Sequence, residues 1–138
     1  MSRKLFLDTD VILGYLIGRP TDQAAHAGAL FEAARNGSVS LFVSDTVLVE
    51  TAVVLWRTLG MERREVAHHL EALLEAPGVD TYDKEAFGRA LDFFEEYPVD
   101  LADAVLSSYA IAEGAAIASL DPVLDRIPGV IREGRWPD

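Results

Sequence analysis

Short apolar runs alternate along the chain with longer stretches in which apolar residues recur at helical spacing. Val11, Ile12, Tyr15 and Leu16 show this spacing, which is typical of an amphipathic helix. The short runs predict strands at residues 4–7, 40–43, 79–81, 115–120 and 130–131. The longer stretches, with their capping residues included, predict helices at 11–18, 21–35, 44–59, 62–76, 83–96 and 100–114.

Turn-forming residues separate these elements. Gly18-Arg19-Pro20, Asn36-Gly37, Gly60 and Pro77-Gly78 each end a predicted helix. Strands that are apolar throughout and separated by helices favour a parallel sheet covered on both faces. We therefore predict an α/β fold, a three-layer α/β/α sandwich with a central parallel sheet of four to five strands. The length of 138 residues and the lack of repeats or linkers predict a single domain over 1–138.

Composition narrows the chemistry. The chain has no cysteine, which excludes disulfides, thiolate metal sites and cysteine nucleophiles. No apolar run approaches the roughly 18 residues of a membrane span, and the N-terminal segment reaches Asp8 too soon for a signal peptide. We expect a cytoplasmic protein without membrane contact. The net charge of −11 argues against non-specific binding of nucleic acid, although carboxylates that hold a cation would be neutralised by it.

Two aspartates directly follow predicted strands. Asp8 comes after the first strand and Asp121 after the fourth. In open parallel sheets, ligands bind beyond the carboxyl ends of the strands, so the two side chains converge if their strands are neighbours. Helix capping explains either aspartate equally well, because a carboxylate at such a junction accepts hydrogen bonds from free backbone N–H groups.

Two further carboxylates lie among apolar neighbours. Glu50 is surrounded by Val, Leu, Ala and Thr in the third predicted helix, with no Lys or Arg three or four residues away. A buried carboxylate needs a partner, either a distant arginine or a metal ion. Asp103 has a similar setting and shares a helix face with Asp100, which an N-cap role explains. Carboxylates without Cys or an obvious ligand His suit Mg²⁺ or Mn²⁺, which activate water at phosphorus centres.

This pattern resembles the PIN-domain ribonucleases, and in particular VapC-type toxins of toxin–antitoxin pairs. The matching motifs are Leu7-Asp8-Thr9, Glu50 in the helix after the second strand, Asp100-Leu101-Ala102-Asp103-Ala104 and Ser119-Leu120-Asp121. Their order runs through the whole chain. Two departures concern the metal geometry: position 10 is Asp where the family more often has Asn or Ser, and Pro122-Val123-Leu124 replaces the usual Phe-containing turn.

The resemblance implies an Mg²⁺- or Mn²⁺-dependent endoribonuclease whose products carry a 5′-phosphate. It implies that Asp8, Glu50, Asp103 and Asp121 are the catalytic metal ligands, for one or two ions, and that Thr9 and Ser119 support them. Asp100 is then either a further ligand or a helix cap. The resemblance also implies a small antitoxin partner with a basic segment, and it allows a homodimer. An apolar groove for the partner, or plain core, is formed by Tyr15, Leu16, Ala27, Leu30 and Phe31.

Two alternatives belong to other functional classes. Asp8-Thr9-Asp10 resembles the opening motif of haloacid dehalogenase-type phosphatases, with Asp121 and Asp125 as metal-binding acids, but this leaves Glu50 and Asp103 unexplained. A non-catalytic PIN-like binding module would be expected to have lost the acidic residues, which are present here. Arg57, Arg63 and Arg64 are candidates for phosphate contact, but the sequence shows no aromatic-plus-basic surface for single-stranded RNA.

Overall fold

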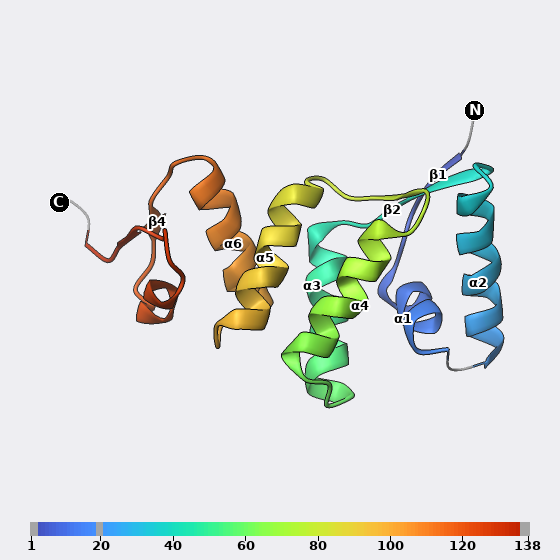
Figure 1. The fold of residues 1–138 in the computed structure, drawn as a ribbon, viewed down its shortest axis with the longest axis horizontal. Helices are drawn as coiled ribbons and strands as arrows, with labels where there is room; N and C mark the ends of the chain where they lie inside the picture. The colour runs from blue at the N-terminus through green and yellow to red at the C-terminus, as the bar shows by residue number, and fades with distance from the viewer. Residues whose placement is uncertain (1–2, 19–20, 136–138) are drawn as a thin grey trace. The chain divides into compact units, whose positions relative to one another are not determined.

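The computed structural model describes residues 3–18 and 21–135 of the chain (Figure 1). The chain falls into two compact units, Met1–Lys84 and Glu85–Asp138, and each is described by itself. The predicted stop signals Arg19 and Pro20 lie outside the described residues. In the ranges that the structure describes, no helix combines the length and the apolar character needed to cross a membrane.

The first unit is built on a parallel sheet with helices between its strands (Figure 1). Its strands, β1 (Arg3–Phe6), β2 (Val39–Phe42) and β3 (Val79–Asp80), pair in the order β1-β2-β3. Its helices are α1 (Thr9–Ile17), α2 (Thr21–Arg35), α3 (Asp45–Val53) and α4 (Arg63–Glu75), and a π-helical turn, η1 (Val54–Thr58), continues α3. Helix α2 packs against β2, α4 packs against β3, and α1 contacts both α2 and α3.

The register of this sheet separates a buried face from an exposed one. Leu41 of β2 lies beside Leu5 of β1 and Val79 of β3, while Phe6 lies beside Phe42. Because side chains alternate along a strand, Leu41 and Val79 share the buried face. On the other face Phe6 of the edge strand is 62% exposed, whereas Phe42 of the central strand is buried. All three strands run in the same direction, so the residues that follow β1 and β2 come to the same edge of the sheet.

The second unit contains two helices and a small parallel ladder. Its elements are α5 (Lys84–Glu96, which begins at the last residue of the first unit), α6 (Leu101–Ala112), β4 (Ile117–Ala118), a 3₁₀ turn η2 (Pro122–Arg126) and β5 (Arg132–Glu133). The hydroxyl of Ser108 donates a 2.6 Å hydrogen bond to the carbonyl of Ala86, which ties α6 to α5. A small apolar cluster of Ala110, Ile117 and Leu124, with Val123 and Val130 packed against it, connects α6 to the ladder.

The predicted α/β class, with parallel strands and helices between them, is confirmed. Six α-helices occur in the described ranges, one at each predicted position. The strands differ from the prediction, because the described residues form two sheets, of three and two strands, where one central sheet was expected. Apolar runs indicate where strands form but not which strand edges pair. The three-layer arrangement and the single domain over 1–138 concern both units together, and both stay predictions.

The last strand was predicted two residues too early. Residues 130–131 were expected to form it, but β5 is Arg132–Glu133. Val130 packs against the apolar cluster, whereas Ile131 is 63% exposed and only its carbonyl reaches the ladder, where it accepts from the N–H of Ile117 (2.8 Å). The fourth strand is also shorter than the predicted 115–120 run, and the 3₁₀ turn η2 was not predicted.

Gly78 precedes β3 in a conformation that an L-residue adopts only with strain (φ +81°), and its missing side chain leaves room for α2. A Cβ there would lie 2.7 Å from the carbonyl oxygen of Ala34. We expect Gly78→Ala to lower the free energy of unfolding by roughly 2 kcal/mol or more, through backbone strain and overpacking. Gly28 in α2 has open space around it, and Gly28→Ala should raise the same quantity by about 0.5–1 kcal/mol. Urea unfolding measures both changes, and equal effects would contradict this account of Gly78.

Candidate functional site

Asp8 stands at the junction of β1 and α1 in the first unit. It occupies the N-cap of α1, and its Oδ1 accepts a 2.7 Å hydrogen bond from the backbone N–H of Thr9. The capping interpretation is therefore confirmed for this residue. It leaves room for a second role, because a carboxylate offers about four lone-pair sites, and the Asp8 side chain is exposed.

Thr9 joins this junction to α3. Its hydroxyl donates a 3.1 Å hydrogen bond to Oε2 of Glu50, across 41 positions of sequence. Thr9 is 8% exposed, so the bond is anchored at a buried position. The supporting role predicted for Thr9 thus has a geometric basis, and the structure brings Asp8, Thr9 and Glu50 together at one edge of the sheet.

Glu50 differs from the prediction in its burial. The sequence predicts a buried carboxylate, but Glu50 is exposed. The apolar neighbours along the helix face elsewhere: Leu48 and Ala52 turn into the core, and the hydroxyl of Thr51 donates back to the carbonyl of Val47 (2.7 Å). Side chains adjacent in sequence point in different directions on a helix, so an apolar neighbourhood in sequence need not be one in space.

Three of the predicted acids lie near one another in the second unit. Asp100 occupies the N-cap position of α6, without a side-chain capping bond within that helix, and Asp103 lies in its first turn. Burial raises the pKa of the Asp103 carboxyl, and the negative charges of Asp100 and Asp121 raise it further. The charged form of Asp103 is therefore disfavoured first by its burial and then by the two neighbouring carboxylates.

Asp121 is held by bonds to its own turn. Its backbone N–H donates a 3.0 Å hydrogen bond to the hydroxyl of Ser119, and its Oδ1 accepts from the N–H of Val123 (3.0 Å). Asp121 therefore caps η2, which Pro122 begins at a position where a missing N–H costs nothing. Ser119 supports the backbone of Asp121, as Thr9 supports the side chain of Glu50.

The predicted ligands thus form two partial sets, one in each unit. Their donors are carboxylate and hydroxyl oxygens, which Mg²⁺ and Mn²⁺ prefer, and the repulsion at Asp103 is of the kind that a bound cation relieves. Across residues 3–18 and 21–135, no three His, Cys, Asp or Glu side chains are close enough to hold a metal ion. That Asp8 and Glu50 act together with Asp103 and Asp121 stays a prediction.

Arg132 is a residue that the sequence did not single out. Its guanidinium donates to both carboxylate oxygens of Asp125, at 2.9 and 3.0 Å, and to the carbonyl of Ser119 at 3.1 Å. The hydrogen bond and positive charge of Arg132 lower the pKa of Asp125. No sequence signal marks this pair, because the two residues lie seven apart in different elements. In the phosphatase alternative Asp125 is a metal-binding acid, but here it is committed to Arg132.

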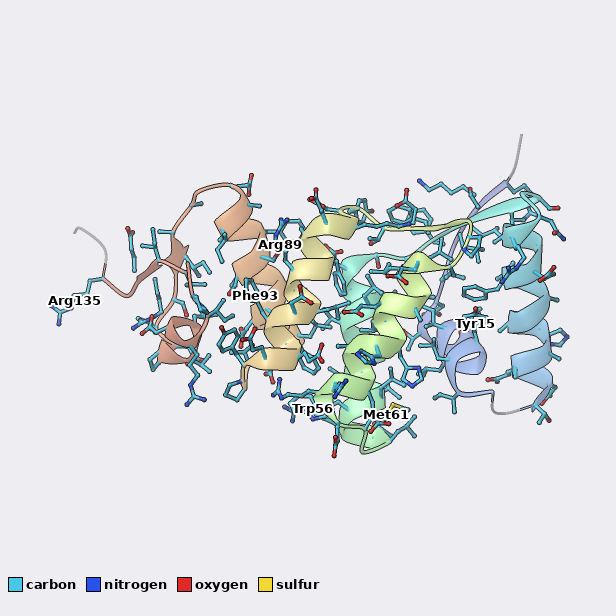
Figure 2. All side chains as sticks on the ribbon, in the orientation of Figure 1. Tyr15, Trp56, Met61, Arg89, Phe93 and Arg135 are labelled. Atoms are coloured by element: carbon cyan, nitrogen blue, oxygen red, sulfur yellow. The ribbon has the colours of Figure 1, made fainter. Side chains whose placement is uncertain are left out.

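An aromatic and basic cluster also emerges in the first unit, where the sequence did not show one. The ring of Trp56 in η1 (labelled in Figure 2) has the guanidinium carbons of Arg57 at 4.8 Å and of Arg63 at 4.6 Å. Arg63 begins α4, so the cluster depends on the turn between η1 and α4. A ring that stacks on guanidinium groups limits their motion and fixes where their charge lies.

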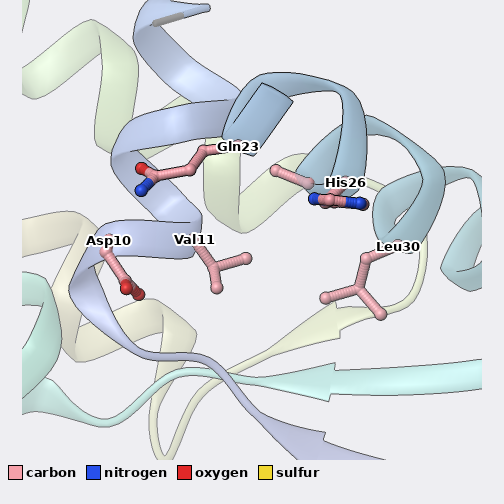
Figure 3. Close-up of a pocket in the computed structure, with 6 residues that line it drawn as sticks. Asp10, Val11, Gln23, His26 and Leu30 are labelled. Carbon is pink, nitrogen blue, oxygen red and sulfur yellow. The ribbon is translucent and has the colours of Figure 1, made fainter. Parts of the chain in front are cut away.

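A cavity of about 320 Å³ lies between α1 and α2 (Figure 3). It is lined by Asp10, Val11, Gln23, His26, Ala27 and Leu30. Of the residues expected to form a partner groove, Leu30 and Ala27 line this cavity, while Phe31 is buried with the ring of Tyr15 stacked on it at 3.7 Å. Part of the predicted groove is therefore core. The cavity that remains has an apolar lining of Val11, Ala27 and Leu30, with Asp10 as its acidic side chain.

Comparison with known proteins gives a family-level result. Residues 5–130 match the PIN domain family. Among solved structures, the chain is similar to the crystal structure of VapBC2 from Rickettsia felis bound to a DNA fragment from their promoter. That similarity has 18% identity and a TM-score of 0.38, and it covers 94% of this chain and 97% of the other. A comparison with curated proteins found no match.

The raised pKa of Asp103 predicts a stability effect in the absence of metal. Its charged form is disfavoured in the folded state, so the native chain loses stability as the pH rises above 3.8, the ordinary value for aspartate. We expect Asp103→Asn to raise the melting temperature at pH 7 in chelator. The gain should shrink as the pH falls toward 3.8 and as salt screens the repulsion.

Thermal unfolding at several pH values measures this difference. Asp92→Asn, on an exposed position of α5, removes the same charge from the same unit and is the control. An Asp103→Asn protein no more stable than the control at pH 7 would show that Asp103 is not electrostatically strained.

Proposed function

Because this chain belongs to the PIN-domain family, whose members are typically nucleases, we propose that it is a metal-dependent endoribonuclease. We further propose that it is the toxin of a type II toxin–antitoxin pair. The match runs through both units, from residue 5 to residue 130, and we propose that the units together form one PIN domain over 1–138.

The observation that carries the proposal is the gathering of predicted acids within each unit. The hydroxyl of Thr9 ties Glu50 to the junction that holds Asp8. In the second unit Asp103 responds to the charge of Asp121. We propose that these four carboxylates together hold one or two Mg²⁺ or Mn²⁺ ions, with Asp100 as a flanking acid.

In this proposal the bound ion supplies Lewis acidity for a phosphodiester and lowers the pKa of a water molecule. The chain's own residues hold the ligand carboxylates in place and orient them. The cap on α1 fixes Asp8 at the end of β1, and Thr9 fixes the carboxylate of Glu50 by donating to it. Ser119 fixes the backbone of Asp121. Hydrogen bonds of this kind, made to ligands by neighbouring groups, orient the ligand oxygens before an ion arrives.

RNA also needs positive contacts, because its phosphates dominate the affinity of proteins for it. The chain has 12 basic residues against 23 acidic ones, so their placement matters more than their number. The Trp56 cluster orders two guanidinium groups, Arg57 and Arg63, in the turn that follows α3. Helix α3 carries Glu50, and η1, which carries Trp56, directly continues α3. This cluster supports an RNA substrate despite the net charge.

The two alternatives are supported less well. The phosphatase needs Asp125 as a metal-binding acid, whereas Arg132 holds both of its carboxylate oxygens. It also gives Glu50 no role, although Thr9 positions that residue. A non-catalytic module would have no need to keep like charges close to Asp103, because the repulsion costs stability.

The proposed partner is an antitoxin with a basic segment. The cavity between α1 and α2 is lined by the apolar side chains of Val11, Ala27 and Leu30 and by the polar side chains of Asp10, Gln23 and His26. Figure 3 shows Val11 and Asp10 on α1 facing His26 and Leu30 of α2. An apolar side chain followed by Lys or Arg complements this lining, and the net charge of −11 would speed the approach of a basic protein. We further propose cytoplasmic action and allow a homodimer, both on the family resemblance.

Metal-dependent cleavage of RNA is the first test. We expect the native chain to cut a mixed RNA panel with Mg²⁺ or Mn²⁺ but not in chelator, leaving 5′-phosphates. Asp8→Asn, Glu50→Gln, Asp103→Asn and Asp121→Asn should each reduce the rate on the order of 100-fold or more, since each removes a ligand charge.

Asp10→Asn is the matched control, because it removes a charge two residues from Asp8 and should leave the rate within about threefold, as expected of a residue outside the ligand set. Cleavage that persists in chelator would contradict a metal-dependent site. Turnover of p-nitrophenyl phosphate that requires both Asp8 and Asp10 would instead support the phosphatase.

The partner site is tested separately, and any small protein whose gene adjoins the gene for this chain is the first candidate antitoxin. We expect the two proteins to form a complex that inhibits cleavage. Leu30→Glu should weaken the complex about tenfold or more, because it places a charge in an apolar lining. Leu59→Glu, at an exposed position outside the cavity, is the control.

Titration calorimetry measures both affinities, and the rate of RNA cleavage without the partner should not change in Leu30→Glu. Equal loss of affinity in the two variants would show that the cavity is not the interface. If the native chain does not bind the candidate antitoxin, the antitoxin part of the proposal fails. The proposed nuclease activity does not depend on that result.

A further inference from the structure

The turn that carries Asp121 is closed by a single side chain from β5. Arg132 donates through Nε and Nη2 to the two oxygens of Asp125 in η2, at 2.9 and 3.0 Å. Its Nη1 donates to the carbonyl oxygen of Ser119, just after β4, at 3.1 Å. One guanidinium therefore bonds to the chain on both sides of Asp121, two residues before it and four residues after it.

The bonds that Asp121 itself makes are local. The N–H of Asp121 donates to Ser119, and its Oδ1 accepts from Val123, so both bonds span only two residues. The turn is also anchored at its start, where the N–H of Ser119 donates to the carbonyl of Glu133 at 3.1 Å, and in η2, where Leu124 is buried in the apolar cluster. Arg132 adds a side-chain attachment between these two points, from a strand whose register with β4 is fixed.

We propose that Arg132 is a positioning residue, which clamps the Ser119–Asp125 turn so that the carboxylate of Asp121 is held ready for a metal ion. The proposal rests on the proposed function, in which Asp121 is a ligand. It assigns a role to a residue that lies beyond the 5–130 match to the family. It also explains why the Arg132 side chain is only 21% exposed although Asp125 is 54% exposed.

The space around the clamp supports this role. A Cβ at Gly134 would lie 3.0 Å from Nη1 of Arg132 and 3.5 Å from the carbonyl oxygen of Ser119. The first distance is tighter than ordinary van der Waals contact, so a side chain here would press on the bond between guanidinium and carbonyl. Glycine at position 134 keeps this bond free of interference.

The positive charge of Arg132 also supports the proposed positioning role. The hydrogen bond that Arg132 donates to Asp125 raises the pKa of Arg132 most, and the negative charges of Asp125 and Asp121 raise it further. A permanent positive charge close to Asp121 offsets part of the repulsion among the acids of this unit. A fork that bonds to both oxygens of a carboxylate also has defined geometry, which a lysine at this position would not reproduce.

The test compares Arg132→Gln, Arg132→Lys and Asp125→Asn with Arg126→Gln. The control removes the same charge from η2, at an exposed position. The first readout needs no metal: amide hydrogen exchange at Val123, whose N–H bonds to Asp121. We expect exchange there to be about tenfold faster in the three clamp variants, because the turn loosens, and unchanged in the control.

The second readout is the affinity for Mn²⁺ alone, measured by calorimetry. We expect about tenfold weaker binding in the clamp variants, the loss typical of a group that orients a ligand, and no change in Arg126→Gln. Gly134→Ala, which keeps every charge, should weaken Mn²⁺ binding in the same direction. It serves as the second probe if removing Arg132 unfolds the unit.

The outcomes separate the clamp from the proposed function. Native exchange and native Mn²⁺ affinity in Arg132→Gln would overturn the clamp. The same result in Arg132→Lys would show that the two-pronged geometry of the guanidinium is not needed. If Asp121→Asn binds Mn²⁺ as tightly as the native chain, Asp121 is not a ligand and that part of the proposed function fails. Faster exchange at Val123 in Arg132→Gln would still confirm the clamp on the turn.

Discussion

Hydrogen bonds that hold carboxylates in place are the interaction on which the candidate site depends. In the first unit Thr9 donates to Glu50 beside the cap made by Asp8. In the second unit burial raises the pKa of Asp103, and the negative charges of Asp100 and Asp121 raise it further, so the charged form of Asp103 costs stability. A fold that keeps such a cluster forgoes stability at this point, which is typical of functional sites.

Capping and ligand roles are often treated as rival explanations of an aspartate at a strand end. Here Asp8 and Asp121 both cap helical turns through Oδ1. The caps also fix the direction of each carboxylate, which a metal ligand needs. The same residue can therefore stabilise its turn and present oxygens to a cation, and evidence for the first role does not weaken the second.

The net charge of −11 does not by itself indicate what the protein binds, because binding depends on where the charged side chains lie. Basic side chains occur at defined points, with Arg132 bound to the turn of Asp121 and two arginines stacked on Trp56. Asp10, in contrast, adds negative charge to an apolar cavity between α1 and α2. This arrangement is consistent with the RNA substrate and the basic partner that we propose.

The sequence by itself determined the succession of helices and strands and the parallel α/β class, because hydrophobic periodicity and turn residues act locally. It also placed Asp8 and Asp121 at strand ends. The tertiary structure decided the exposure of Glu50, its bond to Thr9, the pairing of Arg132 with Asp125 and the stacking of two arginines on Trp56. These contacts depend on which side chains the fold brings together, either across 7 to 41 positions of sequence or across a turn. Local patterns do not specify such contacts, because each depends on the direction of a side chain as well as on its spacing in sequence.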